Sequence, residues 1–347
     1  MSKVKVLMIG PARNVHGGIS GVVNNYYNAG LDREIDLRYI GTMVDGTKLR
    51  KLLQAAVAYV GFLILLPRYR IVHVHVASDS SYYRKSFFIK TAKWAGKSIV
   101  IHQHGGDFIN YYRNLSSGRQ QGIRRTFSMA DVFLVLSPAW KDFFATVIDE
   151  DKIIVFPNAV SESGLISKKY GQQKMLLLGR LCAEKGIGEL LSVMPALKEK
   201  FPKCRLYLAG IWEDNKLEKQ AEELDDCVTY LGWITGEEKK KYLEECDIFV
   251  LPSYCEGQPV AVLEAMSYAC VVTASDVGGI PSMITNGETG ILVKPQDTAS
   301  LQAGLEKALS EPELCECMGM AAKHKVENEF SMKTNVDKLL ELYAKLI

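Results

Sequence analysis

The chain of 347 residues is longer than one ordinary hydrophobic core needs and suits two domains. Hydrophobic residues make up 48% and charged residues 24%, which excludes a disordered, collagen-like or membrane-bundle protein. The net charge of +2 taken alone argues against a nucleic-acid binder. Residues 1–160 hold 21 Lys and Arg against 11 Asp and Glu (+10), whereas residues 161–347 hold 21 against 29 (−8).

The first apolar run, Val4–Ile9, alternates and ends at Gly10, so it predicts a β-strand; a secretory signal needs a longer apolar stretch. All eight cysteines lie between Cys182 and Cys317, and no C-x-x-C pair occurs. We therefore expect reduced thiols, no structural zinc and a cytoplasmic location.

Strands and helices alternate through the first half of the chain. Apolar strands are predicted at Val4–Ile9, Ile35–Ile40, Ile71–Val76, Ser98–His102, Val132–Leu136 and Ile153–Phe156. Helical spacing is found at Ile19–Tyr27, Leu52–Leu66, Tyr82–Trp94 and Trp140–Val147. This alternation predicts a parallel sheet that is covered on both faces.

The second half repeats this organisation after the polar stretch Ser161–Gln173. Its strands are predicted at Met175–Leu178, Arg205–Leu208, Val228–Leu231, Ile248–Leu251, Val271–Ala274 and Ile291–Val293. The predicted class is therefore α/β, with two doubly wound, Rossmann-like domains facing across a cleft. We place the first domain at 1–165, the second at 166–330 and an amphipathic C-terminal helix at 331–347.

Leu52–Leu66 is almost entirely apolar, but its 15 residues are fewer than a membrane-spanning helix needs. Two interpretations remain for this helix: packing on a buried sheet, which such a length favours, or an outer face lying on a membrane. Basic residues flank it, and Tyr82–Lys97 also mixes basic residues with aromatic ones. Those patterns suit either an anionic lipid surface or a solvated helix face.

A Pro/Gly loop between a buried strand and a helix is the most informative motif, IFVLPSYCEGQPVAVLEAM at 248–266. The helix begins near Pro259, and its free backbone amides favour an anion. Gly257 allows close approach of a ligand to the backbone. Glu256 lies at the mouth of this site and Glu264 about two turns into the helix. Two carboxylates beside an anion site indicate a ligand that also carries hydroxyl groups.

Two further loops follow the first strand of each domain. In GRLCAEKG (179–186), Arg180 and Lys185 can neutralise a diphosphate. In RNVHGGISG (13–21), Gly17 and Gly18 offer a flexible backbone cradle. The latter lacks the G-x-G-x-x-G spacing, which disfavours a dinucleotide oxidoreductase.

Four histidines end two neighbouring strands at His73, His75, His102 and His104. A metal site is disfavoured because no carboxylate or cysteine accompanies them, and satisfied core histidines are the simpler interpretation. His104, which precedes two glycines, is the best placed for a cleft. The D-x-D at Asp149–Asp151 could chelate a divalent cation in a nucleotide-sugar enzyme, but it is better interpreted as a solvated turn.

Together these motifs resemble a retaining GT-B glycosyltransferase of family 4, of the bacterial polysaccharide or glycolipid assembly type. The matching pieces are Gly17–Gly18, His104–Gly105, Pro157–Asn158, 179–186, Glu256 with Glu264, Gly278–Pro281 and 286–293. The resemblance spans nearly the whole chain and depends on the order and spacing of the pieces together.

The resemblance implies a role for each matching residue. Arg180 and Lys185 would hold the donor's diphosphate and stabilise it as the leaving group. Glu264 would bind ribose hydroxyls, and Glu256 with the following residues Gly257, Gln258, Pro259 and Val260 would contact the donor sugar. His104 would reach towards that sugar from the opposite domain, and Gly17–Gly18 would close over the diphosphate. The final helix would cross back to the first domain.

The implied reaction is metal-independent transfer of a hexosyl group from a nucleotide-sugar to a hydroxyl group, with the α configuration retained and no cofactor. The sequence departs from the family pattern at Ala209–Trp212, at Ser282 and at Gln258–Pro259, which leaves the donor sugar open. We expect UDP-sugars first and GDP-mannose second.

The basic first half suits an acceptor domain on the inner face of the plasma membrane, with a saccharide or lipid-linked saccharide as acceptor and no nucleic-acid partner. The alternatives are a nucleotide-sugar epimerase, which would turn over the donor without acceptor, and a non-catalytic nucleotide-sugar-binding subunit.

Overall fold

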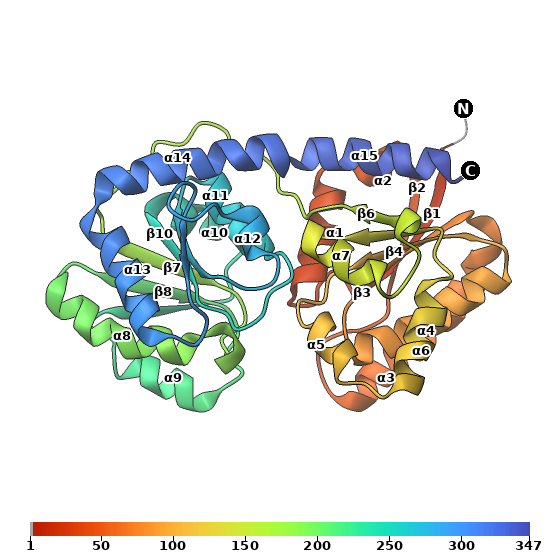
Figure 1. Ribbon diagram of the computed structural model, residues 1–347, viewed down its shortest axis with the longest axis horizontal. Helices are drawn as coiled ribbons and strands as arrows, with labels where there is room; N and C mark the ends of the chain where they lie inside the picture. The colour runs from red at the N-terminus through yellow and green to blue at the C-terminus, as the bar shows by residue number, and fades with distance from the viewer. Residues whose placement is uncertain (1–2) are drawn as a thin grey trace. The chain divides into compact units, whose positions relative to one another are not determined.

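The computed structural model describes residues 3–347. It contains two compact units, which we call unit 1 (residues up to 159, together with 332–347) and unit 2 (residues 160–331). The predicted boundary after residue 165 lies a few residues beyond this division. Each unit is a twisted parallel sheet covered by helices (Figure 1).

Unit 1 contains six parallel strands in the order β2-β1-β3-β4-β5-β6. The strands are β1 (Lys5–Gly10), β2 (Asp36–Gly41), β3 (Ile71–Val76), β4 (Ser98–Gln103), β5 (Val132–Val135) and β6 (Ile153–Val155). The helices are α1 (Gly18–Asn28), α2 (Leu31–Glu34), α3 (Lys48–Leu65), α4 (Ser80–Trp94), α5 (Phe108–Arg113), α6 (Ser117–Phe127), α7 (Pro138–Ala145) and α15 (Met332–Lys345), with 3-10 turns η1 (Leu66–Arg68) and η2 (Glu150–Lys152).

Unit 2 also has six parallel strands, in the order β12-β11-β10-β7-β8-β9. The strands are β7 (Lys174–Leu178), β8 (Arg205–Ala209), β9 (Val228–Gly232), β10 (Ile248–Leu251), β11 (Val271–Ser275) and β12 (Ile291–Val293). The helices are α8 (Ile187–Lys200), α9 (Asn215–Glu222), α10 (Gly236–Glu245), α11 (Val260–Ser267), α12 (Ile280–Met283), α13 (Thr298–Ser310) and α14 (Pro312–Glu329), with the 3-10 turn η3 (Ala183–Lys185).

The central strands are buried on both faces, as their continuous apolar sequences predict. In β7, Met175 and Leu177 join one hydrophobic cluster, whereas Leu176 and Leu178 join the cluster on the other face. All twelve predicted strands form, each within one residue of the predicted ends. The predicted class of two Rossmann-like α/β domains is confirmed.

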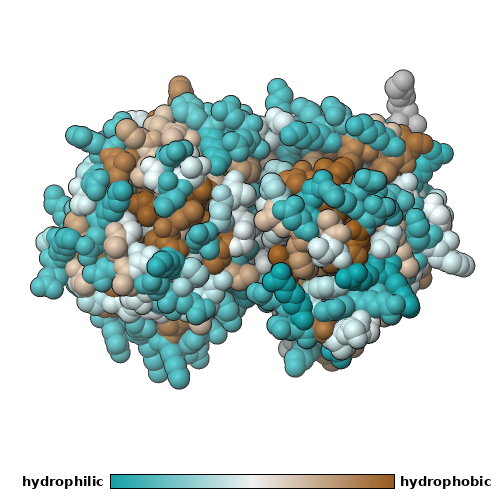
Figure 2. All heavy atoms as spheres, viewed as in Figure 1, coloured by the Kyte–Doolittle hydropathy of each residue, from teal (hydrophilic) through white to brown (hydrophobic). Residues whose placement is uncertain are grey.

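Helix α3 differs from the favoured expectation of a helix packed entirely on the buried sheet. Only Ala58 and Phe62 are buried within it, and its other face is exposed because α3 lies on the outside of unit 1. The segment Lys48–Arg68 is long and apolar enough to cross a membrane by length and composition alone, and 17% of the 18-residue stretch within it that meets this criterion is buried. In the face seen in Figure 2, hydrophilic residues form most of the outline, and hydrophobic ones show between them on each unit.

Candidate active site

The strand order of unit 2 places its expected ligand-binding position at β7 and β10. The later strands β8 and β9 are added on one side of this pair and β11 and β12 on the other, so the sheet has its topological switch point there. In doubly wound sheets ligands bind beyond the carboxyl ends of the strands at that point. Arg180 and Lys185 follow β7 and Glu256 follows β10, so the structure brings these predicted residues to the same edge.

The loops after β7 and β10 are packed against each other. Gly186 adopts φ +69°, and a Cβ there would lie 2.1 Å from the carbonyl oxygen of Pro252. The amide of Tyr254 donates to the carbonyl of Glu184 over 2.9 Å. A glycine is therefore required at the end of the GRLCAEKG motif both for its backbone angle and for the close approach of the second loop.

Lys185 and Glu256 form an ion pair at this edge. Ser253 also donates to the same carboxylate oxygen of Glu256, Oε1, over 2.8 Å. The side chain of Lys185 is 19% exposed and that of Glu256 is 10% exposed, so the pair is screened little by water. An anion bound by Lys185 would therefore compete with the Glu256 carboxylate.

A second glycine turn, at Gly278, packs against the backbone of Glu256. Gly278 adopts φ +56°, and a Cβ there would lie 1.8 Å from the carbonyl oxygen of Glu256. Gly257, Gln258 and Pro259 then lead into α11, where Pro259 is the N-cap residue and Val260 the first helical one. The backbone amides at the start of α11 follow Glu256 closely in the chain, and a helix N-terminus favours a bound anion.

Glu264 is the fifth residue of α11 and lies just over one turn from its start at Val260, not two turns in as predicted. Its carboxylate accepts from Lys239 of α10 over 2.7 Å, and both side chains are largely buried. Lys239 was not predictable from the sequence, because α10 is a highly charged helix in which one lysine does not stand out.

Arg180 forms a more exposed pair with Glu213 over 2.9 Å, at the end of the loop after β8. Both side chains are between 40% and 50% exposed (49% and 43%). Exposed pairs of this kind contribute about 0–1 kcal/mol, so little opposes the exchange of Glu213 for a ligand's phosphate.

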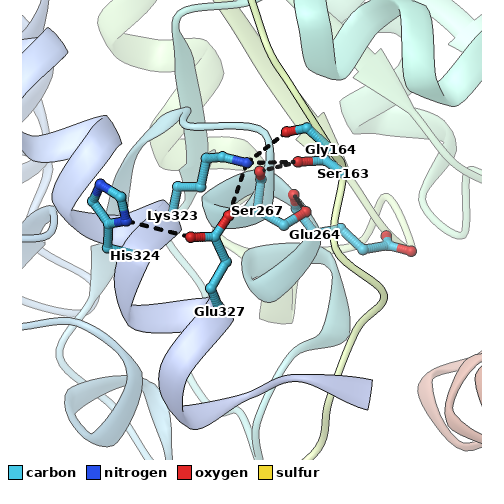
Figure 3. A network of polar contacts seen from close by, with 7 residues as sticks. All are labelled: Ser163, Gly164, Glu264, Ser267, Lys323, His324 and Glu327. Carbon is cyan, nitrogen blue, oxygen red and sulfur yellow. Dashed lines mark hydrogen bonds and ion pairs between the residues drawn. The ribbon is translucent and has the colours of Figure 1, made fainter. Parts of the chain in front are cut away.

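The C-terminal end of α11 is held by a buried lysine of α14 (Figure 3). Lys323 donates to the carbonyl of Gly164 over 2.7 Å and pairs with Glu327 at 3.0 Å. Lys323 also donates to the Ser163 hydroxyl over 3.5 Å, and this hydroxyl donates to the carbonyl of Ser267. The Ser267 hydroxyl in turn donates to the carbonyl of Glu264. The Glu264 side chain points away from this network in Figure 3, so Lys323 positions the helix and leaves the carboxylate to Lys239.

In unit 1, Gly17 and Gly18 form the start of α1 after β1. Gly17 is the N-cap residue and supplies no side chain, and a Cβ at either glycine would meet no atom within 4 Å. The first amides of α1 therefore face open space, which suits the predicted backbone cradle for an anion.

His104 follows β4 and accepts or donates a 2.9 Å hydrogen bond through Nε2 with Nδ1 of His75. The rings of His73, His75, His102 and His104 pack as one group, with His73 inside β3 and not at its end as predicted. His73 also bonds the Tyr343 hydroxyl of α15 at 2.5 Å. Burial lowers the pKa of His104 well below its usual range, so its ring is neutral at pH 7. It can act as a neutral hydrogen-bonding group.

Ring nitrogens of His73, His75 and His102 lie within 4.8 Å of one another and form the one group of at least three possible metal ligands within residues 3–347. All three side chains are completely buried in the sheet beneath α15. The group lacks the carboxylate and cysteine ligands that the sequence analysis also found missing. The Asp149–Asp151 turn is exposed, and Asp149 caps η2 through the amide of Asp151.

Lys85 was grouped with the basic surface of the helix 82–97, but it is buried, with 1% of the side chain exposed. Its ammonium donates to Ser81 over 2.8 Å, and burial together with Arg84 lowers its pKa to about 7. Its neighbours in the sequence are basic or aromatic, so the sequence offered no signal that this lysine turns inward.

The second half of the chain is similar to a known protein family. Residues 165–325 match the family described as "Glycosyl transferases group 1". The amylovoran biosynthesis glycosyltransferase AmsK of Erwinia amylovora is 28% identical over 273 residues, which cover 72% of this chain and 64% of AmsK. The chain thus spans just under two thirds of that relative.

Two solved structures are similar in fold over nearly all of both chains. Sucrose-phosphate synthase from Thermosynechococcus elongatus has a TM-score of 0.81 at 19% identity, covering 99% of each chain. Anabaena HepE in complex with UDP has a TM-score of 0.77 at 15% identity, covering 99% of this chain and 100% of HepE. Residues 165–325 therefore resemble a group 1 glycosyltransferase domain, and the fold of the whole chain resembles that of these two structures.

Proposed function

We propose that this chain transfers a sugar from a nucleotide-sugar to a hydroxyl group of a saccharide acceptor, with the α configuration of the sugar retained. The observation that carries the proposal is the pairing of Lys185 with Glu256 at the switch point of unit 2, beside Arg180 and the start of α11. A cation, a carboxylate and free helix amides at one edge suit a donor with both phosphate and hydroxyl groups.

The chemistry follows from the charge that develops on the leaving diphosphate. Lys185 and Arg180 can stabilise that charge once each exchanges its carboxylate partner for phosphate oxygens. The amides at the start of α11 add partial positive charge. These groups provide the electrostatic role that a divalent cation would otherwise fill, so we propose a metal-independent reaction with no cofactor.

The remaining predicted residues take the parts that the resemblance implies. Glu264 would accept hydrogen bonds from ribose hydroxyls, either after its ion pair with Lys239 opens or while that pair is kept. Glu256 and the backbone of 257–260 would contact the sugar, as would the neutral ring of His104. Gly17 and Gly18 would offer amides to the diphosphate. With the anomeric carbon held this way, front-face attack with the diphosphate assisting deprotonation would retain its configuration.

The names of similar proteins guide the choice of substrates. HepE was solved with UDP and with UDP-glucose, and AmsK is named for amylovoran biosynthesis. We therefore propose a UDP-sugar as donor, GDP-mannose as the second choice, and polysaccharide or glycolipid assembly on the cytoplasmic side of the membrane. The acceptor would be a saccharide, most suitably one linked to lipid.

The test is nucleotide release by the purified chain with UDP-, GDP- and ADP-sugars, each with and without lipid-linked saccharides. We expect acceptor-dependent release of one nucleotide that EDTA leaves unchanged, and an α-linked product by NMR. Lys185→Ala and Glu264→Gln should each lower the rate by at least ~10²-fold. The matched surface variants Lys219→Ala and Glu222→Gln, both on α9, should leave the rate unchanged.

Each other outcome has a distinct meaning. Donor conversion to an epimer without acceptor would replace transfer by epimerisation. Nucleotide-sugar binding without turnover on the whole panel would favour a non-catalytic subunit. Loss of activity in EDTA with recovery in Mn²⁺ would overturn the metal-independent mechanism, and full activity of Lys185→Ala would remove the assigned site.

A further inference from the structure

Helix α3 presents an unbroken apolar stripe to solvent. Its large side chains are between 44% and 68% exposed and recur every three or four residues: Leu49, Leu52, Leu53, Val57, Val60, Leu63 and Ile64. This spacing places them on one side of a helix. Contiguous exposed apolar surface of this extent marks an interaction site in a soluble protein.

Helix α4 extends this surface. Tyr83, Phe87 and Trp94 are exposed along one side, Trp94 by 89%, and Lys90 falls between them at the same helical spacing. Lys97 lies just beyond the end of α4. Aromatic rings alternating with lysines are typical of a boundary between water and lipid. In Figure 1, α3 and α4 lie on the outside of unit 1 near its lower edge.

The two helices are fixed to each other from beneath. Phe88 of α4 packs edge-on against Tyr59 and Phe62 of α3, with ring centroids 5.2 and 5.0 Å apart. Tyr59 also bonds the Thr91 hydroxyl over 2.7 Å. The stripe of α3 and the stripe of α4 are therefore parts of one rigid surface, which we call the α3–α4 surface.

A groove of about 560 Å³ runs between these helices. Its apolar side chains include Leu52, Ala55 and Phe87, and its cations are Lys48, Lys51 and Arg84. A phospholipid has the same two chemistries, an apolar chain and an anionic headgroup. The groove therefore suits lipid better than it suits an uncharged apolar partner.

The charge around the α3–α4 surface is almost entirely of one sign. Residues 46–106 contain a single acidic residue, Asp79, and ten basic ones: Lys48, Arg50, Lys51, Arg68, Arg70, Arg84, Lys85, Lys90, Lys93 and Lys97. Of these, Lys85 is buried. Such a field attracts anionic lipid and opposes the approach of a second, equally basic copy of this surface.

We propose that the α3–α4 surface docks unit 1 on an anionic membrane, with α3 lying in the plane of the interface. Phe62 is completely buried against α4, so α3 stays part of unit 1 and does not cross the bilayer. This inference goes beyond the proposed function and does not depend on it. Docking would raise the rate at which the protein meets a lipid-linked acceptor, because it confines the protein to the surface that carries the acceptor.

The test is co-sedimentation of the full chain, without donor, with vesicles of phosphatidylcholine alone or mixed with phosphatidylglycerol. We expect binding to the anionic vesicles that weakens as salt is added. The double variant Leu53→Glu/Val57→Glu should lose it, while Leu165→Glu, at a fully exposed leucine of unit 2, should keep it. Lys90→Glu should weaken binding at least fivefold, and Lys338→Glu on α15 much less.

Thermal unfolding of each variant shows whether it folds, since all these side chains point outward. Equal sedimentation with neutral and anionic vesicles would overturn the proposal, as would full binding by Leu53→Glu/Val57→Glu. So would a dimer in sedimentation velocity that this double variant dissociates, because the occupant would then be a second copy. Resistance of the bound protein to alkaline extraction would indicate a spanning helix instead. None of these readouts involves sugar transfer.

Discussion

Replacement of Glu256 by glutamine tests whether the Lys185–Glu256 pair controls binding of the diphosphate. Glutamine keeps the shape of the side chain and can still accept from Ser253. It removes the negative charge and leaves the Lys185 ammonium, only 19% exposed, without its carboxylate. Loss of a partner in a buried pair costs about 3–5 kcal/mol, and the partial exposure here reduces the expected loss of folding stability to about 1–2 kcal/mol.

A bound nucleoside diphosphate would give Lys185 a new anionic partner. UDP should therefore bind the variant more tightly than the wild type, by about 1 kcal/mol or roughly fivefold in the dissociation constant, because it restores an anionic partner to Lys185. Sugar transfer should nevertheless fall by about 10²-fold, because Glu256 no longer positions the donor sugar. Opposite changes in binding and in rate are the signature of this pair.

Calorimetric titration of UDP into the wild type, Glu256→Gln, Lys185→Ala and the double variant measures the coupling directly. The tightening by Glu256→Gln should vanish in the Lys185→Ala background and should shrink as salt is added. Glu213→Gln, which frees the more exposed Arg180, should give a smaller gain. Unchanged or weaker UDP binding by Glu256→Gln, with an unchanged unfolding midpoint, would refute the reasoning.

Three further changes test other parts of the molecule. Lys85 has a folded pKa of about 7 against 10.5 when exposed, so between these pH values the unfolded chain binds more protons than the folded chain. The free energy of unfolding should therefore rise by about 1.4 kcal/mol per pH unit. Lys85→Met should remove this rise, as measured by denaturant unfolding at pH 7 and pH 9. Gly278→Ala should lower both the melting temperature and the transfer rate, the latter at least ~10-fold, because its Cβ would strike the Glu256 carbonyl; full activity would show that this turn does not support the site. Lys323→Met should cost about 1–3 kcal/mol of stability by chemical denaturation, and His324→Ala, which removes only an exposed contact to Glu327, less than about 0.5 kcal/mol.

The sequence was sufficient for the features that depend on local pattern. Runs such as Met175–Leu178 and Ile248–Leu251 are apolar at every position, and this distinguishes a strand covered on both faces from its surroundings. The loops that follow such strands all meet at one edge of a parallel sheet. For this reason the sequence could place Arg180, Lys185 and Glu256 together without any contact being known.

Contacts between distant residues were not predictable in the same way. Lys239 and Glu264 are 25 positions apart, and neither the acidic and basic pattern of α10 nor the apolar pattern of α11 selects one pairing. Lys85 and Trp94 stand in one helix with similar neighbours, yet Lys85 is buried and Trp94 exposed. Helix α4 carries apolar or aromatic residues on more than one side, so its sequence does not specify which side meets the sheet.

The pairings also change how the positive charge of the candidate site should be understood. From the sequence, Arg180 and Lys185 appear as two cations available to a diphosphate. In the structure each already has a carboxylate, Glu213 and Glu256, and so the ligand-free edge is close to neutral. We infer that the donor's phosphates gain their cations by displacing these carboxylates. The displaced Glu256 then carries an unpaired negative charge, which favours hydrogen bonds from the hydroxyl groups of the donor sugar.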